Sequence, residues 1–490
     1  MNSALVVIVL FLIIAFYLGI KAKKGKEMSL DEWAVGGRGF GAFFIFVLLA
    51  GEMNTTFTFL GGSGWAYSKG APAAYMIIYL PLSIIFMYWL GPAIWKYARQ
   101  HKLVSQSDFF VSKYNSRFLG VLVAIIGVIA MVPYLGLQLK GLGIIVSAAS
   151  YGAISETTAI IIGAFTLTIY VMVSGIHGSA WTAALKDIMI FLIVVFLGIY
   201  LPFHYYGGIQ PMFEAVEKIK PEFFTLPKEG LSVSWFISAS LLSAIGGMAW
   251  PHLFGAVYAS KSAKSIRKNT IMQPVYSLIL MFVFFVGFAA IGQVPGLEGP
   301  DSDFALLNLS MQTFDPWFVG VIGAAGLLTA LVPASMLMMA TTTSFSLNVY
   351  KVLAPKTSEK TIARLAKYLV PVVAFIAVYF TLYGGDTIVT LLLLGYGFVA
   401  QLLPALFFSF MKNNFVTKYG AIAGMIAGVG VVMYTTIMNS TVGSLFPSLP
   451  SVIKDLDIGI IALVINLIIT IIVSLLTGKQ SINKEEKQPA

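Results

Sequence analysis

The chain has 490 residues, of which 58% are hydrophobic and only 11% charged, with a net charge of +10. Soluble domains carry roughly 25% charged residues, so the composition excludes a soluble globular protein. Cysteine is absent and the four histidines lie far apart, which excludes disulfides, thiolate catalysis and Cys-ligated zinc or iron–sulfur sites. The basic residues form no arm or stripe for nucleic acid. The partners expected are therefore a small solute and the lipid bilayer, with no nucleic acid and no obligatory protein partner.

Apolar runs of spanning length predict an all-α membrane protein. A bilayer span takes about 20 apolar residues, and the chain contains thirteen such runs. The predicted spans are residues 3–20, 41–67, 72–96, 117–149, 155–175, 180–203, 233–258, 271–294, 317–350, 361–383, 387–411, 417–439 and 457–477. In the first span the lysines follow the apolar stretch rather than precede it, so it is predicted to be a retained helix and not a signal peptide.

The positive charges predict the orientation. With the N-terminus outside, 25 of the 31 lysines and arginines lie on the cytoplasmic side and five on the outer side, while Lys140 lies inside a helix. Lys186, in the sixth span, is counted on the cytoplasmic side. This bias satisfies the positive-inside rule. We therefore expect a protein of the cytoplasmic membrane with its N-terminus outside and its C-terminus in the cytoplasm.

Two predicted spans contain helix-breaking sequence at membrane depth. The second runs from Ala50 to Thr58 into a glycine-rich stretch at 61–64, and the seventh carries Trp250-Pro251-His252 after two glycines. Unwound backbone is tolerated there only where it is buried in protein or lines a cavity. Broken helices at corresponding places in two halves indicate an inverted-repeat transporter. The alternative is that these glycines only allow close helix packing.

This pattern predicts one transmembrane transporter domain over residues 1–490. Its predicted parts are an extra first helix at 3–20, repeats at 41–203 and 233–411, two extra helices within 417–477 and a cytoplasmic tail at 478–490.

Several short segments carry a resemblance to a known family. They are Trp33-Ala34-Val35-Gly36-Gly37-Arg38-Gly39-Phe40-Gly41, Phe59 to Gly70, Trp181-Thr182, Trp250-Pro251-His252 and Asn348-Val349-Tyr350-Lys351. Through them the chain resembles the sodium:solute symporter family along nearly its whole length, and within it the pantothenate- and monocarboxylate-type permeases. The resemblance implies a leucine-transporter-like 5+5 inverted repeat with broken helices 2 and 7. It also implies cation-coupled uptake of a small solute.

The chain departs from this family where sodium is bound. In sodium-coupled members, adjacent hydroxyl residues of span 9 coordinate the ion against backbone carbonyls of span 2. The matching positions here hold Val332 and Pro333, which offer no side-chain oxygen. The family's aspartate after the Trp-Thr of span 6 is Ala183 here, with Asp187 one turn later. The coupling ion is therefore left open between proton and sodium, with no other cofactor expected and no metal site beyond a possible sodium site.

Glu52 is the first candidate for coupling. A carboxylate near the middle of a membrane is costly unless it is protonated, paired or in contact with water, and the resemblance places Glu52 at the family's sodium site. Its alternative role is a structural acid that bonds the broken backbone. The residues expected at the cation-coupling site are Glu52, Leu49, Thr329 and Ser335.

Lys140 is a candidate for binding a carboxylate. A buried ammonium needs an anion, and the options are Glu52, Asp187 or the carboxylate of a solute; alternatively Lys140 extends to the outer interface. The expected solute-binding residues are Thr55, Thr56, Gln138, Lys140 and Trp250, of which Thr55 and Thr56 match solute-facing positions of the family. His252 is predicted to be structural.

The function predicted is secondary active symport of a small organic solute, most simply a carboxylate, by alternating access. The alternatives are sodium-coupled uptake of a neutral or zwitterionic solute (an amino acid, sugar or vitamin) and a membrane sensor with a transporter-like fold. A channel would differ by showing no accumulation against a gradient. An enzyme would need convergent catalytic groups, which the sequence does not show.

Overall fold

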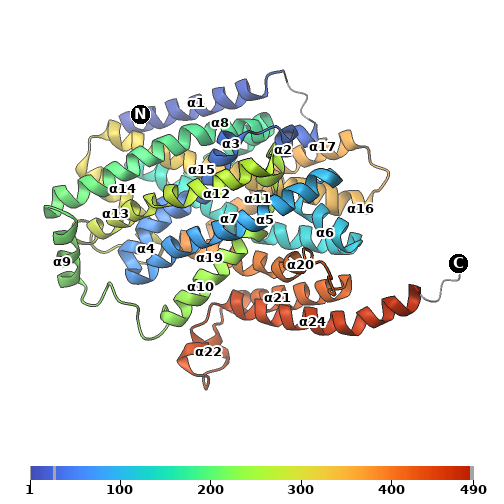
Figure 1. Cartoon of the computed structure of the whole chain (residues 1–490). Helices are drawn as coiled ribbons and strands as arrows, with labels where there is room; N and C mark the ends of the chain where they lie inside the picture. Colours follow the sequence, from blue (N-terminus) through green and yellow to red (C-terminus); the bar gives the residue numbers. More distant parts are fainter. Residues whose placement is uncertain (1, 26–28, 486–490) are drawn as a thin grey trace.

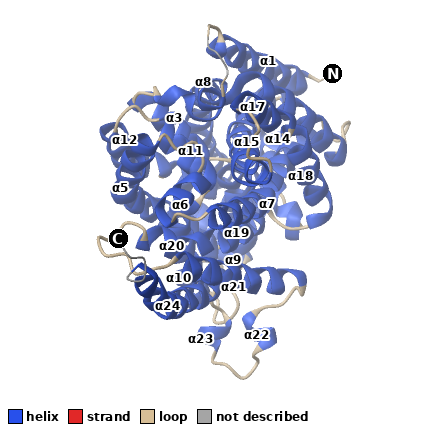
Figure 2. Cartoon of the chain, turned by 90° about the vertical axis from the view of Figure 1, so that its right-hand side faces the viewer, coloured by secondary structure: helices blue, strands red, loops and turns tan. Residues whose placement is uncertain are grey.

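The computed structural model describes residues 2–25 and 29–485, with the side chains of 479–485 left out of the description. These residues form helices joined by short connections, and among them no β-strand occurs (Figure 2). The α-helices are α1 Ser3–Lys23, α2 Leu30–Val35, α3 Ala42–Met53, α4 Gly62–Lys69, α5 Tyr75–His101, α6 Gln106–Tyr114, α7 Arg117–Ala149, α8 Glu156–Tyr206, α9 Ile209–Ile219, α10 Val233–Gly246, α11 Pro251–Ala259, α12 Ala263–Ser277, α13 Ile279–Gln293, α14 Ala305–Thr313, α15 Pro316–Ser344, α16 Lys351–Leu353, α17 Glu359–Tyr368, α18 Val370–Gly384, α19 Ile388–Val399, α20 Leu403–Phe408, α21 Lys418–Ile437, α22 Val442–Leu445, α23 Ser451–Lys454 and α24 Ile458–Glu485.

Local sequence explains where the long helices begin. The side chains of Asn2, Ser116 and Ser155 accept hydrogen bonds from backbone N–H groups in the first turns of α1, α7 and α8. Such caps satisfy N–H groups that have no partner within the helix. α15 begins at Pro316, whose missing N–H costs nothing in the first turn of a helix.

Ten helical stretches of the described chain are long and apolar enough to cross a membrane. Two further pairs meet this test jointly: Ala42–Met53 with Phe57–Lys69, bent by 48°, and Val233–Ala249 with Pro251–Ala259, bent by 50°. The two breaks predicted from the sequence are therefore present. Large apolar side chains such as Trp89, Phe165 and Phe375 are exposed on the outside of the bundle, as expected for a surface that faces lipid.

α8 differs from the two separate spans predicted at 155–175 and 180–203. It is assigned as one helix of 51 residues, which at 1.5 Å per residue would be about 76 Å long, more than twice the hydrocarbon core of a bilayer. Gly175 interrupts it with φ 57° and ψ −163°, a backbone conformation that only glycine adopts at little cost. The two predicted spans are thus the two arms of an interrupted helix.

α7 and α15 form the centre of the bundle. α15 packs against α7, α8 and α1, and most of its side chains are buried. α1 lies on one side of the molecule, and α21 and α24 pack on each other at the opposite side (Figure 1). The two broken segments lie between these sides, with the first packed against α8, α12 and α13 and the second against α5 and α15.

Candidate transport site

The first break follows α3 at Asn54, whose backbone leaves the helical region at φ −102° and ψ 86°. Local side chains replace the lost helical hydrogen bonds: the Asn54 amide donates to the carbonyl of Ala50 at 3.1 Å, and the Thr58 hydroxyl donates to that of Thr55 at 2.8 Å. The Thr55 hydroxyl accepts from the N–H of Phe57 at 3.1 Å. Asn and Thr compete for backbone groups in this way, so the sequence itself favours a break here.

Side chains from three other helices donate to the carbonyls around this break. Gln273 of α12 donates to the carbonyl of Leu49 at 3.0 Å, and the Tyr134 hydroxyl of α7 to that of Glu52 at 2.9 Å. The Lys186 ammonium of α8 donates to the carbonyls of Gly51 at 3.1 Å and Asn54 at 2.8 Å. The carbonyls in the last turns of α3 and at the break therefore have protein donors, as the hydrocarbon region of a membrane requires for unwound backbone.

The second break lies between a 3-10 turn at Gly247–Ala249 and Pro251, which begins α11. The residue before a proline is pushed toward extended backbone, and Trp250 has φ −69° and ψ 126°. Gln106 donates to the carbonyl of Ala249 at 2.6 Å. The Trp250 side chain is buried, with its ring centroid 4.9 Å from that of Tyr134 and 5.3 Å from that of Tyr396. This break is enclosed mainly by aromatic rings.

The two breaks bring Glu52 and His252 together. The Glu52 Oε2 and His252 Nε2 atoms lie 3.3 Å apart, and both residues are 2% exposed. Within the described chain, neither carboxylate oxygen of Glu52 nor His252 Nδ1 has a hydrogen-bond partner. From the sequence His252 was predicted to be structural, and no contact with Glu52 was expected. The contact joins residues 200 positions apart, so no local signal could have revealed it.

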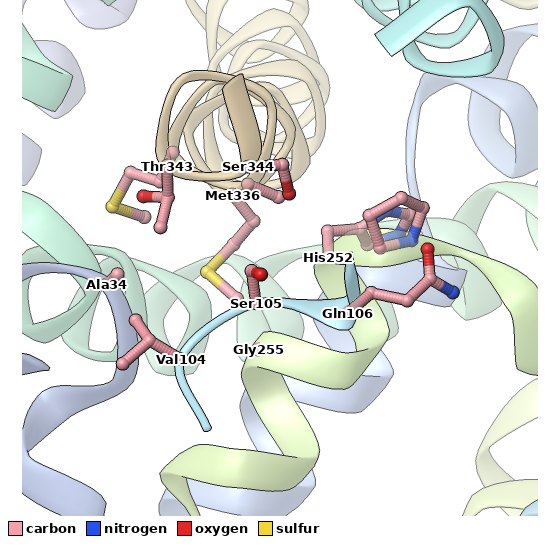
Figure 3. Close-up of a pocket in the computed structure, with 12 residues that line it drawn as sticks. Ala34, Val104, Ser105, Gln106, His252, Gly255, Met336, Thr343 and Ser344 are labelled. Atoms are coloured by element: carbon pink, nitrogen blue, oxygen red, sulfur yellow. The ribbon is translucent and has the colours of Figure 1, made fainter. Parts of the chain in front are cut away.

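Glu52 and His252 line a small cavity between the two breaks. Its other lining residues are mostly apolar or aromatic and include Tyr79, Tyr134, Trp250, Leu392 and Tyr396. His252 also lines a second cavity between α11, the segment that leads into α6, and α15 (Figure 3). The lining of this second cavity includes Ser105, Gln106 and Met336, and His252 is among the residues that line both spaces.

Of the predicted solute-binding residues, one lines this cavity and the others do not. The Thr56 hydroxyl donates to Gln138 Oε1 at 2.6 Å, so the structure brings this predicted pair together. Neither these two residues nor Thr55, whose hydroxyl bonds its own turn, is among those that line the central cavity. Trp250 does line it. A role in solute binding stays a prediction for all of them.

Lys140 does not reach the predicted side-chain partners Glu52 and Asp187. Its ammonium lies 3.2 Å from Asp303 Oδ2 and donates to the carbonyl of Asp386 at 2.6 Å. Asp303 belongs to the connection before α14, and it also accepts from the N–H of Ile388 at 3.0 Å. Lys140 thus joins α7 to two connections, where it lines a separate pocket with Glu156 and Asp301.

Lys186 was counted among the cytoplasmic charges, and the structure corrects this. Its side chain is fully buried and lies 2.9 Å from Asp187 Oδ1, against the break after α3. The adjacent charges Lys186-Asp187 within an apolar span were the signal that could have identified it. The hydroxyls of Thr329 and Ser335 donate to the carbonyls of Gly326 and Val332 in their own helix, and their role in cation coupling stays a prediction.

A bundle of apolar helices with two breaks around a buried cavity that holds a glutamate and a histidine defines a multi-pass membrane transporter. The sequence profile of the sodium:solute symporter family matches residues 33–428. The chain belongs to this family, which confirms the resemblance found in the sequence, and it is a cation-coupled symporter rather than an enzyme. The family implies sodium as the coupling ion and a small molecule as the solute.

Relatives and solved structures agree with this assignment. An uncharacterized symporter of Bacillus subtilis, YhjB, is 60% identical over 479 residues, which cover 98% of each chain. A monocarboxylate transport permease protein of Rhizobium johnstonii is 30% identical over 443 residues, 88% of each chain. The solved substrate-bound, outward-open structure of a Na⁺-coupled sialic acid symporter is similar with a TM-score of 0.77 at 17% identity, covering 97% of this chain and 98% of that one.

Proposed function

We propose that this protein takes up a small organic carboxylate across the cytoplasmic membrane and couples its entry to a proton bound at Glu52. The observation that carries this proposal is the Glu52 and His252 pair, which lies unsatisfied in the cavity between the two helix breaks. A buried polar group without a partner is costly. The cavity therefore favours a solute that brings hydrogen-bonding groups of its own.

The second break supports an anionic solute. α11 begins at Pro251 beside this cavity, and the N-terminus of a half-helix carries a partial positive charge that favours anions. A neutral imidazole offers one N–H donor and one acceptor, so His252 can donate to a carboxylate. The 30% identical relative named as a monocarboxylate permease supports the same class of solute.

The same geometry links solute and proton. Two carboxylates that share a buried site repel each other when both are charged, so an anionic solute beside Glu52 favours the protonated form of that carboxyl. By reciprocity, protonation of Glu52 favours the anion. One proton then enters with each solute. Val332, whose side chain lies beside Gly51 of the first break, and Pro333 offer no side-chain oxygen to a sodium ion.

The proposal includes the topology predicted from the sequence. Counting the two arms of α8 separately adds one span to the twelve that length, composition and the two bent pairs define. This gives thirteen crossings, with the N-terminus outside, the C-terminus in the cytoplasm, and two five-helix repeats at 41–203 and 233–411 within one domain. A cysteine placed at Asn2 should react with an impermeant label from outside the cell, and labelling from the cytoplasmic side would contradict this orientation.

Uptake into proteoliposomes tests the function directly. Labelled carboxylates, amino acids and sugars are offered under an imposed pH gradient or an imposed sodium gradient, each with the other gradient absent. We expect saturable accumulation of a carboxylate under the pH gradient without sodium. Uptake that requires sodium and ignores the pH gradient would contradict the proton as the coupling ion. Absence of saturable uptake of every carboxylate would contradict the proposed class of solute.

A further inference from the structure

The Lys186 side chain ends inside the first helix break, where three oxygens surround its ammonium. These are the carbonyl oxygens of Gly51 at 3.1 Å and Asn54 at 2.8 Å, and Asp187 Oδ1 at 2.9 Å. An ammonium has three N–H donors and no acceptor, so each donor has an oxygen to bond. Lys186 is fully buried and Asp187 is 5% exposed.

The surroundings exclude water from this contact. A Cβ added at Gly51 would lie 3.4 Å from Val332 Cγ1, 3.5 Å from Ala183 Cβ and 3.5 Å from Lys186 Nζ. The break therefore packs against two apolar side chains and the ammonium. Two further groups act on the pair: the carboxyl of Glu52 on α3 and the Tyr276 hydroxyl on α12, which lies 3.4 Å from Asp187 Oδ1.

This arrangement has the composition of a cation site: two carbonyls that the break has freed from a helix, one carboxylate, and a positive charge among them. We infer that the Lys186 ammonium is the resident cation of a monovalent-cation site at this break. As a covalently held charge it fills the place that a dissolved ion such as sodium would need, and it holds the break of α3 against α8. This inference deepens the proposed function, because a site that carries its own cation needs no sodium for coupling.

Two features distinguish this site from a lysine that is only paired with an acid. First, two of its three contacts are backbone carbonyls, one in the last turn of α3 and one at the break itself, so the charge stabilises the broken backbone and not only Asp187. Second, removal of the side chain leaves three converging oxygens, one of them charged, without a donor. Unpaired buried oxygens of this kind bind a small cation if one is available.

Thermal unfolding of the purified full-length protein in detergent tests the inference without any solute. The melting temperature is measured in sodium chloride and in choline chloride at equal ionic strength, so that only a sodium-specific effect differs. We expect no sodium-specific shift for the wild-type protein. For Lys186→Ala we expect a sodium-specific rise of about 2 °C or more at about 100 mM salt, because an ion that binds only the folded state stabilises it.

Two further variants control the measurement. Lys186→Ala combined with Asp187→Asn should lose most of the sodium effect, because the charged ligand is gone. Lys113→Ala should show none, since Lys113 donates to the carbonyl of Ser409 and lies outside the break. A sodium-specific rise in the wild-type protein would overturn the inference even if Lys186→Ala does not fold. A folded Lys186→Ala variant that is indifferent to sodium would overturn it as well.

This experiment separates the inference from the proposed function. A failure of carboxylate uptake would contradict the proposed function and leave the sodium measurement unaffected. Uptake of a carboxylate driven by sodium, together with a sodium-specific shift in the wild-type protein, would overturn both.

Discussion

The two broken helices achieve the same interruption by different chemistry. At the first break, donors from α7, α8 and α12 bond the carbonyls near Glu52, and a full positive charge is among them. At the second break, a proline has no N–H that would need an acceptor, Gln106 donates to one carbonyl, and aromatic rings fill the space. The first break is therefore held mainly by hydrogen-bond donors and a charge, and the second mainly by the packing of aromatic rings. Changes at the first should therefore alter coupling, and changes at the second should alter affinity for the solute.

Glu52→Gln should have the largest effect. The amide imitates a permanently protonated carboxyl, so the variant cannot release a proton inside and should lose accumulation of the solute while it still exchanges labelled for unlabelled solute. Counterflow and gradient-driven uptake in proteoliposomes measure the two activities separately. Glu359→Gln, on the exposed start of α17, is the matched control. Full accumulation by Glu52→Gln would remove Glu52 from the coupling step.

Trp250→Phe and Trp250→Ala test the second break. Loss of an aromatic wall of the cavity should raise the KM for the solute by about tenfold in Trp250→Ala and less in Trp250→Phe. The ratio of solute to protons should stay unchanged, because Glu52 is intact. Trp89→Ala provides the control, since that side chain is 72% exposed on the outside of the bundle. A changed ratio with an unchanged KM would reverse the assignment of roles to the two breaks.

Two glutamines allow a matched comparison of stability. Gln106→Ala removes the donor to Ala249 at the second break and should cost about 1 to 3 kcal/mol in the free energy of unfolding. Gln273→Ala should cost less, because its acceptor Leu49 lies within the regular part of α3. Thermal unfolding of both variants in one detergent measures the difference. An equal or larger loss for Gln273→Ala would show that the first break depends on each of its donors.

The smallest effect is expected for Asp303→Asn, a change outside both breaks that should alter how stability depends on pH. Burial raises the pKa of the Asp303 carboxyl above its usual value, and Lys140 opposes this. The folded state therefore takes up a proton at a higher pH than the unfolded state does, so this group favours folding more as the pH falls and less as it rises. Asp303→Asn should remove this pH dependence.

The melting temperature of Asp303→Asn between about pH 7 and pH 5 should change by about 1 °C less than that of the wild-type protein. Asp301→Asn, an exposed neighbour, should match the wild type. A separate variant, Lys140→Gln, tests the partner of Asp303. A selective loss of affinity for carboxylates would support Lys140 as a solute ligand, while unchanged affinity would leave it as the partner of Asp303.

Both breaks could be predicted from the sequence because their causes are local. Asn54, Thr55 and Thr58 compete with the helix for hydrogen bonds within a few residues, and Pro251 acts on the residue before it. The contacts that define the site are not local. Lys186 meets Gly51 across 135 residues and His252 meets Glu52 across 200, so these pairings depend on how distant helices pack. The contact of Asp303 with Lys140 could not be predicted either, because Asp303 lies in a connection between helices and the hydrophobic pattern does not indicate the course of such a connection.

The position of His252 has an electrical consequence. His252 is among the residues that line both the central cavity and the second cavity, so we expect a charge that moves between these spaces to pass beside it, across a layer of closely packed protein with low polarisability. A membrane potential acts most strongly across such a layer, with about 2.3 kcal/mol per elementary charge for every 100 mV that falls there. The rate of transport should then depend on membrane voltage at this one step. The steepness of that dependence would measure the fraction of the membrane potential that falls across the layer beside His252.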